Sequence, residues 1–311
     1  MALDAFILIF SMLALGSLFA RLKVLPDNAA EVLNRVVIYL CLPAAVLLYI
    51  PRLHPEWRLL GLMLTPWLVG GVVWALLTCL KKIFHFRTEE YAVLLLCVAL
   101  GNTGFIGYPM IHALLGETAL AYAVIYDQFG TFLMLSTGGL YVCAQYGGNA
   151  KPTPGLILRR ILRFPPALAL LAGLLVMAGH AALPNLMPSA APVWFLHGLQ
   201  SLSNAMLPLV MLAVGLSLRF QLPRSEIRAL SVGLTLKLLV LPALVWGVSR
   251  LAGLEGDILR VNVLETAMPS MVTAAVLAMA HNLAPRLAAA MVGYGILIAL
   301  GTLPLWVWLL H

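Results

Sequence analysis

Apolar runs of about twenty residues recur along the whole chain, and they leave few choices of fold. A helix needs about 20 apolar residues to cross the hydrocarbon core of a bilayer. Runs that end at charged residues, proline or glycine predict ten spans: 3–20, 31–50, 59–80, 91–115, 118–142, 157–180, 193–217, 229–250, 258–281 and 287–309. We therefore expect an all-α integral membrane protein with ten transmembrane helices.

The composition excludes an ordinary soluble domain. Hydrophobic residues make up 62% of the chain and charged residues 10%, whereas soluble domains carry about 25% charged residues. The formal net charge of +7 does not indicate nucleic-acid binding, because the basic residues lie between apolar runs. The four cysteines show no metal-ligand spacing and are expected to be small buried hydrophobic residues.

The basic residues also predict the orientation in the membrane. Fourteen of the nineteen lysines and arginines fall on the side that holds the connections 21–30, 81–90, 143–160, 218–228 and 282–286. Four fall on the other side, and Lys237 lies inside the eighth span. The positive-inside rule places the rich side in the cytoplasm. We expect a multi-pass protein of the cell (inner) membrane with both termini outside.

The longest polar connection divides the ten spans into two sets of five. An odd number of spans reverses the direction of the second set, so the halves would be inverted repeats, as in many transporters. We expect a first repeat over 1–145, a short cytoplasmic linker over 146–156 and a second repeat over 157–311.

Two spans at corresponding positions of the halves are interrupted. Residues 100–109 read LGNTGFIGYP, and Met268-Pro269-Ser270 interrupts the ninth span. Each unpaired backbone group costs several kcal/mol in hydrocarbon, so such breaks are tolerated mainly where backbone lines a cavity. Paired breaks of this kind indicate a transport site near the middle of the membrane.

The residues of these breaks form the predicted substrate site, which comprises Gly101, Asn102, Thr103, Met268, Pro269 and Ser270. A helix that begins at Ser270 would direct free N–H groups and a positive dipole end at a carboxylate. The alternative is that these polar residues only satisfy frayed helix ends. Glycines and prolines near the breaks or inside other spans are predicted structural hinges: Gly104, Gly107, Pro109, Pro43 and Pro208.

Three ionisable side chains lie deep in predicted spans: Asp127, Lys237 and Glu265. A charge at this depth is costly, so it normally pairs or faces a wet cavity. We expect these residues to act in coupling or as charges that face the cargo. A buried ion pair that fixes helix packing is the open alternative, and it is favoured for Lys237.

No sequence motif indicates an enzyme. The chain has no G-x-x-x-x-G-K-[ST] loop, no HExxH and no GxSxG. We expect no cofactor, no metal site and no ATP-driven step, so that a gradient or the membrane potential drives transport.

Four motifs carry a family resemblance. They are residues 34–43 (NRVVIYLCLP), 102–109 (NTGFIGYP), 236–242 (LKLLVLP) and 267–269 (AMP), in order on the second, fourth, eighth and ninth spans. Together they resemble the auxin efflux carrier family, and the chain is similar to a bacterial member related to the plant PIN auxin exporters. The similarity extends over nearly the whole chain.

The resemblance implies the inverted-repeat fold of bile-acid transporters and sodium/proton exchangers, in which helices four and nine cross. It implies a scaffold domain and a mobile transport domain, each with helices from both repeats, and an elevator mechanism. Asn102 would contact a substrate carboxylate, Pro269 would form the second crossover, and a homodimer would form. Two positions depart from the plant proteins: Gly101 replaces proline, and Glu265 adds an acid.

The favoured function is secondary-active or potential-driven transport of small organic anions, such as monocarboxylates, dicarboxylates or auxin-like acids. The partners expected are this anion, protons, the lipid bilayer and a second copy of the chain, and no nucleic acid. A sodium- or proton-coupled carrier or cation/proton exchanger on the same scaffold is the alternative. A receptor without transport is disfavoured because the sequence holds no soluble signalling domain.

Overall fold

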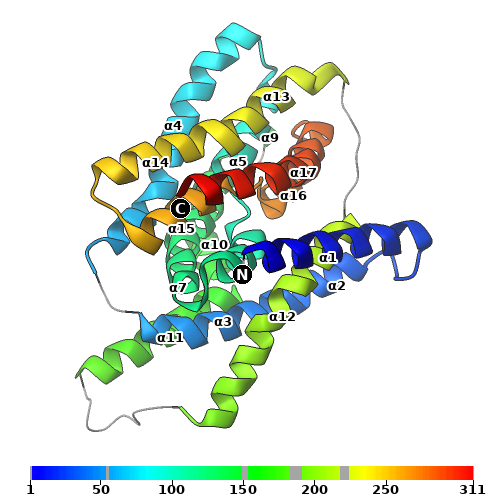
Figure 1. The fold of residues 1–311 in the computed structure, drawn as a ribbon. Helices are drawn as coiled ribbons and strands as arrows, with labels where there is room; N and C mark the ends of the chain where they lie inside the picture. Colours follow the sequence, from blue (N-terminus) through cyan, green and yellow to red (C-terminus); the bar gives the residue numbers. More distant parts are fainter. Residues whose placement is uncertain (1, 54–55, 149–152, 183–190, 218–223, 311) are drawn as a thin grey trace. The chain divides into compact units, whose positions relative to one another are not determined.

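The computed structural model describes residues 2–53, 56–148, 153–182, 191–217 and 224–310. Every regular element in these ranges is helical, and the only extended pairing there is an isolated bridge between Gly101 and Ser270. Figure 1 shows the helices in chain order. The predicted all-α class is confirmed. Residues 149–152 of the predicted linker lie outside the described ranges.

Six described helical segments are long and apolar enough to cross a bilayer. They are Ala29–Arg52, Leu59–Phe84, Glu117–Gly147, Val193–Ser217, Ile227–Leu251 and Pro285–Leu310. Two shorter apolar helices cover Ile7–Leu22 and Pro165–Gly179. These lengths agree with a multi-pass membrane protein, while the ten crossings, their inverted repeat and their orientation stay predictions.

The chain forms two compact units, each built from separate stretches of sequence. The first comprises Met1–Pro55, Gly104–Val124 and Arg159–Leu218, and the second comprises Glu56–Thr103, Ile125–Leu158 and Arg219–His311. Each unit therefore combines stretches from the N-terminal and C-terminal parts of the chain.

Several described helical elements lie wholly within the first unit. They are α1 (Ala2–Leu22), α2 (Ala29–Val36), η1 (Val37–Cys41), α3 (Leu42–Tyr49), η2 (Ile50–Arg52), α6 (Tyr108–Leu115), α11 (Pro165–Ala182) and α12 (Val193–Ser217). Three elements run from one unit into the other: η3 (Thr103–Gly107), α7 (Glu117–Tyr126) and α10 (Pro154–Leu162).

Helices α1 and α12 of the first unit cross in direct backbone contact, as Figure 1 shows. A β-carbon at Gly215 would lie 2.9 Å from the Gly16 α-carbon and would collide with the carbonyl oxygen of Leu13. The hydroxyl of Ser17 donates a hydrogen bond to the Gly215 carbonyl oxygen at 3.3 Å. Small residues permit this close approach, which dispersion forces reward in a membrane.

The second unit contains the longest helices and most of the short helical turns. They are α4 (Leu59–Phe84), α5 (Thr88–Ala99), η4 (Asp127–Thr131), α8 (Phe132–Met134), η5 (Leu135–Gly139), α9 (Leu140–Gly147), η6 (Arg224–Glu226), α13 (Ile227–Thr235), η7 (Leu236–Val240), α14 (Leu241–Leu251), α15 (Gly256–Ala267), α16 (Val272–Ala280) and α17 (Pro285–Leu310).

Three prolines lie in the first turn of a helix that follows a π-helical turn. Pro43, Pro109 and Pro242 are each the second residue of a helix that follows η1, η3 or η7. Proline lacks an N–H group and leaves a carbonyl four residues earlier without its usual donor. A π turn accommodates this because each of its carbonyls accepts a hydrogen bond from the amide five residues later in the chain. Pro208 instead lies within the continuous helix α12, and the hinge roles predicted for these prolines stay predictions.

An ion cluster fixes the first turn of α5. The Arg87 guanidinium contacts Glu90 at 3.0 Å and Glu226 at 2.8 Å, and the Arg87 amide donates to Glu90 at 2.8 Å. The hydrogen bond to Glu90 raises the pKa of Arg87, with Glu226 adding to the effect. The cluster joins the start of α5 to η6.

The glycine contact between α1 and α12 gives a testable consequence. Gly215→Ala should lower the free energy of unfolding by about 1–3 kcal/mol, because the added methyl group must push the two backbones apart. Gly198→Ala on the same helix is the control, since its β-carbon meets nothing within 4 Å. Thermal unfolding in detergent measures both variants, and equal midpoints would contradict the packing role.

Candidate functional site

Two helices of the second unit end in short extended segments that pair with each other. Helix α5 ends at Ala99 and α15 at Ala267, and each has 12 residues. The backbone amide of Asn102 donates to the Pro269 carbonyl at 2.8 Å, and the backbone amide of Met271 donates to the Leu100 carbonyl at 2.9 Å. Backbone groups released by one break thus satisfy those released by the other. We call Leu100–Thr103 and Met268–Met271 the crossover.

The crossover and the adjoining end of α15 contain side chains that are buried without hydrogen-bond partners. Both polar atoms of the Asn102 amide, the Ser270 hydroxyl and both Glu265 carboxyl oxygens lack a partner among the described residues. Asn102 is 1% exposed, and Ser270 and Glu265 are 0% exposed. Buried polar groups are almost always paired, so five unpaired atoms on two backbone-paired segments and the helix end beside them indicate a site for a ligand, an ion or water.

Lys237 brings a positive charge to the crossover. Its side chain extends from the π turn η7 and is buried. The ammonium donates to the Thr266 carbonyl at 3.2 Å, and it interacts electrostatically with Glu265. The predicted cation and the predicted acid therefore lie in one cluster.

Asp127 differs from Glu265 because its carboxylate is hydrogen-bonded. The Thr103 hydroxyl donates to Asp127 Oδ1 at 2.5 Å, and the Gln128 amide donates to Oδ2 at 2.8 Å. These bonds commit the Thr103 hydroxyl to Asp127, so the interaction fixes the end of the crossover to the π turn η4.

A buried polar chain on α15 leads away from the crossover. The Tyr126 hydroxyl lies 3.0 Å from the Thr266 hydroxyl, which donates to the Asn262 carbonyl at 2.8 Å. The Asn262 amide in turn donates to Thr65 at 3.0 Å and to Ser249 at 2.9 Å. The sequence predictions did not include these residues. Their signal is the spacing of Asn262, Glu265 and Thr266, which share one helix face.

The remaining predicted residues lie in the crossover, in η3 and α6, and in the first unit. Met268 and Pro269 are extended residues of the crossover, and Pro269 supplies a carbonyl acceptor. Gly104 and Gly107 lie in η3, and Pro109 is in α6. Pro43 and Pro208 belong to the first unit.

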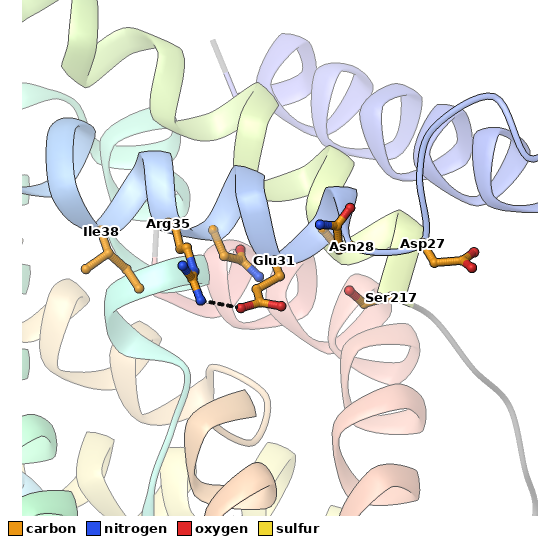
Figure 2. Close-up of a pocket in the computed structure, with 8 residues that line it drawn as sticks. Asp27, Asn28, Glu31, Arg35, Ile38 and Ser217 are labelled. Atoms are coloured by element: carbon orange, nitrogen blue, oxygen red, sulfur yellow. Dashed lines mark hydrogen bonds and ion pairs between the residues drawn. The ribbon is translucent and has the colours of Figure 1, made fainter.

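A separate surface pocket of the first unit contains none of the predicted site residues. Its volume is about 540 Å³. Figure 2 shows the ion pair of Arg35 and Glu31, 2.7 Å apart, beside Asn28 and Ser217. All of these polar groups lie near the ends of α2 and α12, and nothing there matches the unpaired buried atoms of the crossover.

Comparison with known proteins decides the family. A profile described as Membrane transport protein matches residues 1–307. The chain belongs to this family, the auxin efflux carrier family. A relative from Methanocaldococcus jannaschii is 30% identical over 312 residues, which cover 98% of this chain and 97% of the relative. Another from Methanothermobacter thermautotrophicus is 30% identical over 298 residues, or 94% and 93% of the two chains. Both are named uncharacterized transporters.

Membership confirms the predicted family and establishes the chain as a multi-pass membrane transport protein. Among the described residues, the crossover and the adjoining Glu265 bring together five of the buried side-chain atoms that lack hydrogen-bond partners. The roles predicted for its residues in binding and coupling stay predictions.

The bond between Thr103 and Asp127 allows a stability test of the crossover. Thr103→Val should lower the free energy of unfolding by about 1.5–3 kcal/mol, because it removes a donor from a buried carboxylate. Thr137→Val is the control, since the Thr137 hydroxyl donates only to the Leu133 carbonyl of its own helical segment. Denaturant unfolding in detergent compares them. Equal losses would show that Asp127 does not depend on Thr103.

Proposed function

We propose that this protein is a secondary-active or potential-driven transporter of small organic anions that bind at the crossover. The observation that carries the proposal is the set of unpaired polar atoms on Asn102 and Ser270 beside the buried ammonium of Lys237. An amide, a hydroxyl and an ammonium together offer the hydrogen-bond donors that a carboxylate requires.

The backbone around these side chains favours the same ligand. The crossover leads into η3 at Thr103 and into α16 at Val272. The start of a helix carries free N–H groups and a partial positive charge, which stabilise an anion. An anion could thus be held with Lys237 as the single full positive charge.

We further propose that Glu265 couples the anion to a proton. The charged and titratable groups that act on Glu265 are Asp127, Lys237 and Tyr126. An ionised carboxylate that is fully buried without hydrogen bonds is costly, so the buried Glu265 favours its protonated form. An arriving anion adds negative charge and strengthens that preference. Anion and proton would therefore bind together, and acidification of the anion side should increase transport.

In the proposed elevator mechanism, the unit that contains the crossover carries the anion across the membrane. The ten spans, the inverted repeats over 1–145 and 157–311, the cytoplasmic linker and the outside termini are parts of the same proposal. Its support is that each unit draws stretches from both parts of the chain. The homodimer is proposed from the family resemblance.

A cation-coupled carrier or cation/proton exchanger is the second candidate. Glu265 interacts electrostatically with both Asp127 and Lys237, so these three groups together are negative when all of them are ionised. Unpaired oxygen atoms on Glu265, Asn102 and Ser270 would suit a hard cation such as sodium. The described residues contain no group of three or more metal-binding His, Cys, Asp or Glu residues.

Transport by the purified protein in liposomes tests the proposal. Labelled malate, malonate and an indole acid are offered separately, with and without a pH gradient. We expect uptake of at least one carboxylate, with a faster rate when the anion side is acidic. Exchange of protons for sodium without movement of any carboxylate would favour the cation exchanger instead.

Asn102→Ala should reduce uptake by about 10- to 100-fold, because a lost hydrogen bond to a charged ligand is worth about 1.5–3 kcal/mol. The matched control is Asn204→Ala, which alters an exposed asparagine of the first unit. Initial uptake rates in liposomes measure both variants. Normal transport by Asn102→Ala would remove the crossover as the binding site.

Glu265→Gln should abolish the pH dependence of uptake while the protein remains folded, because glutamine cannot exchange a proton. Glu89→Gln is the control, since Glu89 is exposed in the first turn of α5. Uptake is measured across a series of external pH values, with thermal unfolding as the check on folding. An unchanged pH profile in Glu265→Gln would eliminate Glu265 as the coupling group.

A further inference from the structure

The ammonium of Lys237 lies directly against the backbone of Gly101. A β-carbon placed at residue 101 would be 3.0 Å from Lys237 Nζ. It would also be 3.3 Å from the Glu265 carbonyl oxygen and 3.5 Å from the Thr103 methyl group. A β-carbon at residue 101 would therefore make the nitrogen shift by a few tenths of an ångström.

This ammonium is incompletely hydrogen-bonded. It has three N–H groups, and in the part of the chain that the structure describes it donates one hydrogen bond, to the Thr266 carbonyl. The side chain is 1% exposed, so water around the protein cannot serve the other two donors. Arg87 shows the contrast, because it contacts two carboxylates at the edge of the same unit.

The backbone that carries Lys237 is firmly held. Lys237 belongs to the π turn η7, whose Leu236 carbonyl accepts from the Leu241 amide. The indole of Trp306 donates to the Leu238 carbonyl at 2.9 Å. π turns inside helices often occur at functional sites. Here the turn and its indole contact hold the base of the side chain while the ammonium keeps donors unused.

The unused donors lie beside the unpaired groups of the crossover. Gly101 pairs with Ser270 in the extended bridge, and Asn102 is its neighbour in sequence. Neither the Ser270 hydroxyl nor the side-chain amide of Asn102 has a hydrogen-bond partner among the residues that the structure describes. A carboxylate at this point would receive hydrogen bonds from groups on three separate segments: η7 and the two extended segments of the crossover.

The charges of the cluster limit how much negative charge it can accept. Asp127 and Lys237 act on Glu265 with opposite charges, so the sum of these two charges is zero when both are ionised, and Glu265 adds none when it holds its proton. One carboxylate then leaves a single negative charge in the cluster, and a second carboxylate would double it. The cost of burying uncompensated charge rises steeply.

We infer that Lys237 recognises the substrate carboxylate, that Gly101 leaves room for its ammonium in the position that binds it, and that the site favours monocarboxylates over dicarboxylates. This inference rests on the proposed anion transport. It gives Lys237 a role in specificity in place of the packing role that the sequence favoured, and it relates that role to the glycine at residue 101.

A double-mutant cycle in the purified full-length protein tests the inference. The variants are Gly101→Ala, Lys237→Met and both together, because methionine keeps the length of the lysine stem but lacks the ammonium. Calorimetry in detergent at pH 7 measures binding of indole acetate and lactate as monocarboxylates and of malonate as the dicarboxylate. Thermal unfolding verifies that each variant is folded.

Each single variant should weaken monocarboxylate binding at least about tenfold, as expected for a lost charged hydrogen bond. The double variant should bind no more weakly than Lys237→Met, because the new methyl group has no ammonium to displace. The new methyl group at residue 101 also approaches the Glu265 carbonyl oxygen. This contact is present both in the wild-type and in the Lys237→Met background, so its effect on binding cancels in the cycle. The wild type should bind at least one monocarboxylate about tenfold more tightly than malonate.

Other outcomes overturn separate parts of the inference. Unchanged binding in Lys237→Met would make Lys237 structural, and additive effects would limit Gly101 to its backbone role. Tighter binding of malonate would overturn the preference for one carboxylate while leaving anion transport intact. Where Gly101→Ala does not fold, Lys237→Met and the malonate comparison still decide the role of the ammonium. Absence of any carboxylate binding by the wild type would remove the proposed function together with this inference.

Discussion

Two backbone hydrogen bonds support the whole candidate site. The pairs Asn102–Pro269 and Met271–Leu100 let two helices stop inside an apolar unit without leaving amides and carbonyls unpaired. A helix normally satisfies its own backbone in a membrane, and a break must find another solution. Here the backbone groups of each break form hydrogen bonds with those of the other break. Because the two segments satisfy each other's backbone, their side chains remain available for other contacts.

The two buried acids near the crossover, Asp127 and Glu265, differ in their hydrogen bonds. Asp127 receives hydrogen bonds from Thr103 and Gln128, whereas Glu265 has none. Both are buried carboxyl groups in apolar segments, so hydropathy treats them alike. Only the identity of their neighbours separates a carboxylate that holds the crossover in place from one that could exchange a proton.

The sequence predicted the helical class, the family and the positions of both breaks, because proline, glycine and polar residues are rare in apolar spans. It also selected Asn102, Ser270, Glu265, Asp127 and Lys237, since charged and amide side chains are conspicuous there. It did not identify Asn262, Thr266 or Tyr126, whose polar chain depends on which helix faces meet. The contact between Lys237 and Gly101 could not be predicted either, because the distance between two helices cannot be inferred from the sequence of either helix alone.

The π turns have a consequence for the phase of these helices. Successive residues of an α-helix are separated by about 100° of rotation, and a π turn inserts one residue beyond the ordinary spacing. Residues after η4 and η7 therefore face a direction that a uniform helical wheel assigns to their neighbours. Asp127 and Lys237 both lie in such turns. Deletion of a single residue could thus redirect these charges without replacing either one, so insertion and deletion are as relevant as substitution to how such a site diverges.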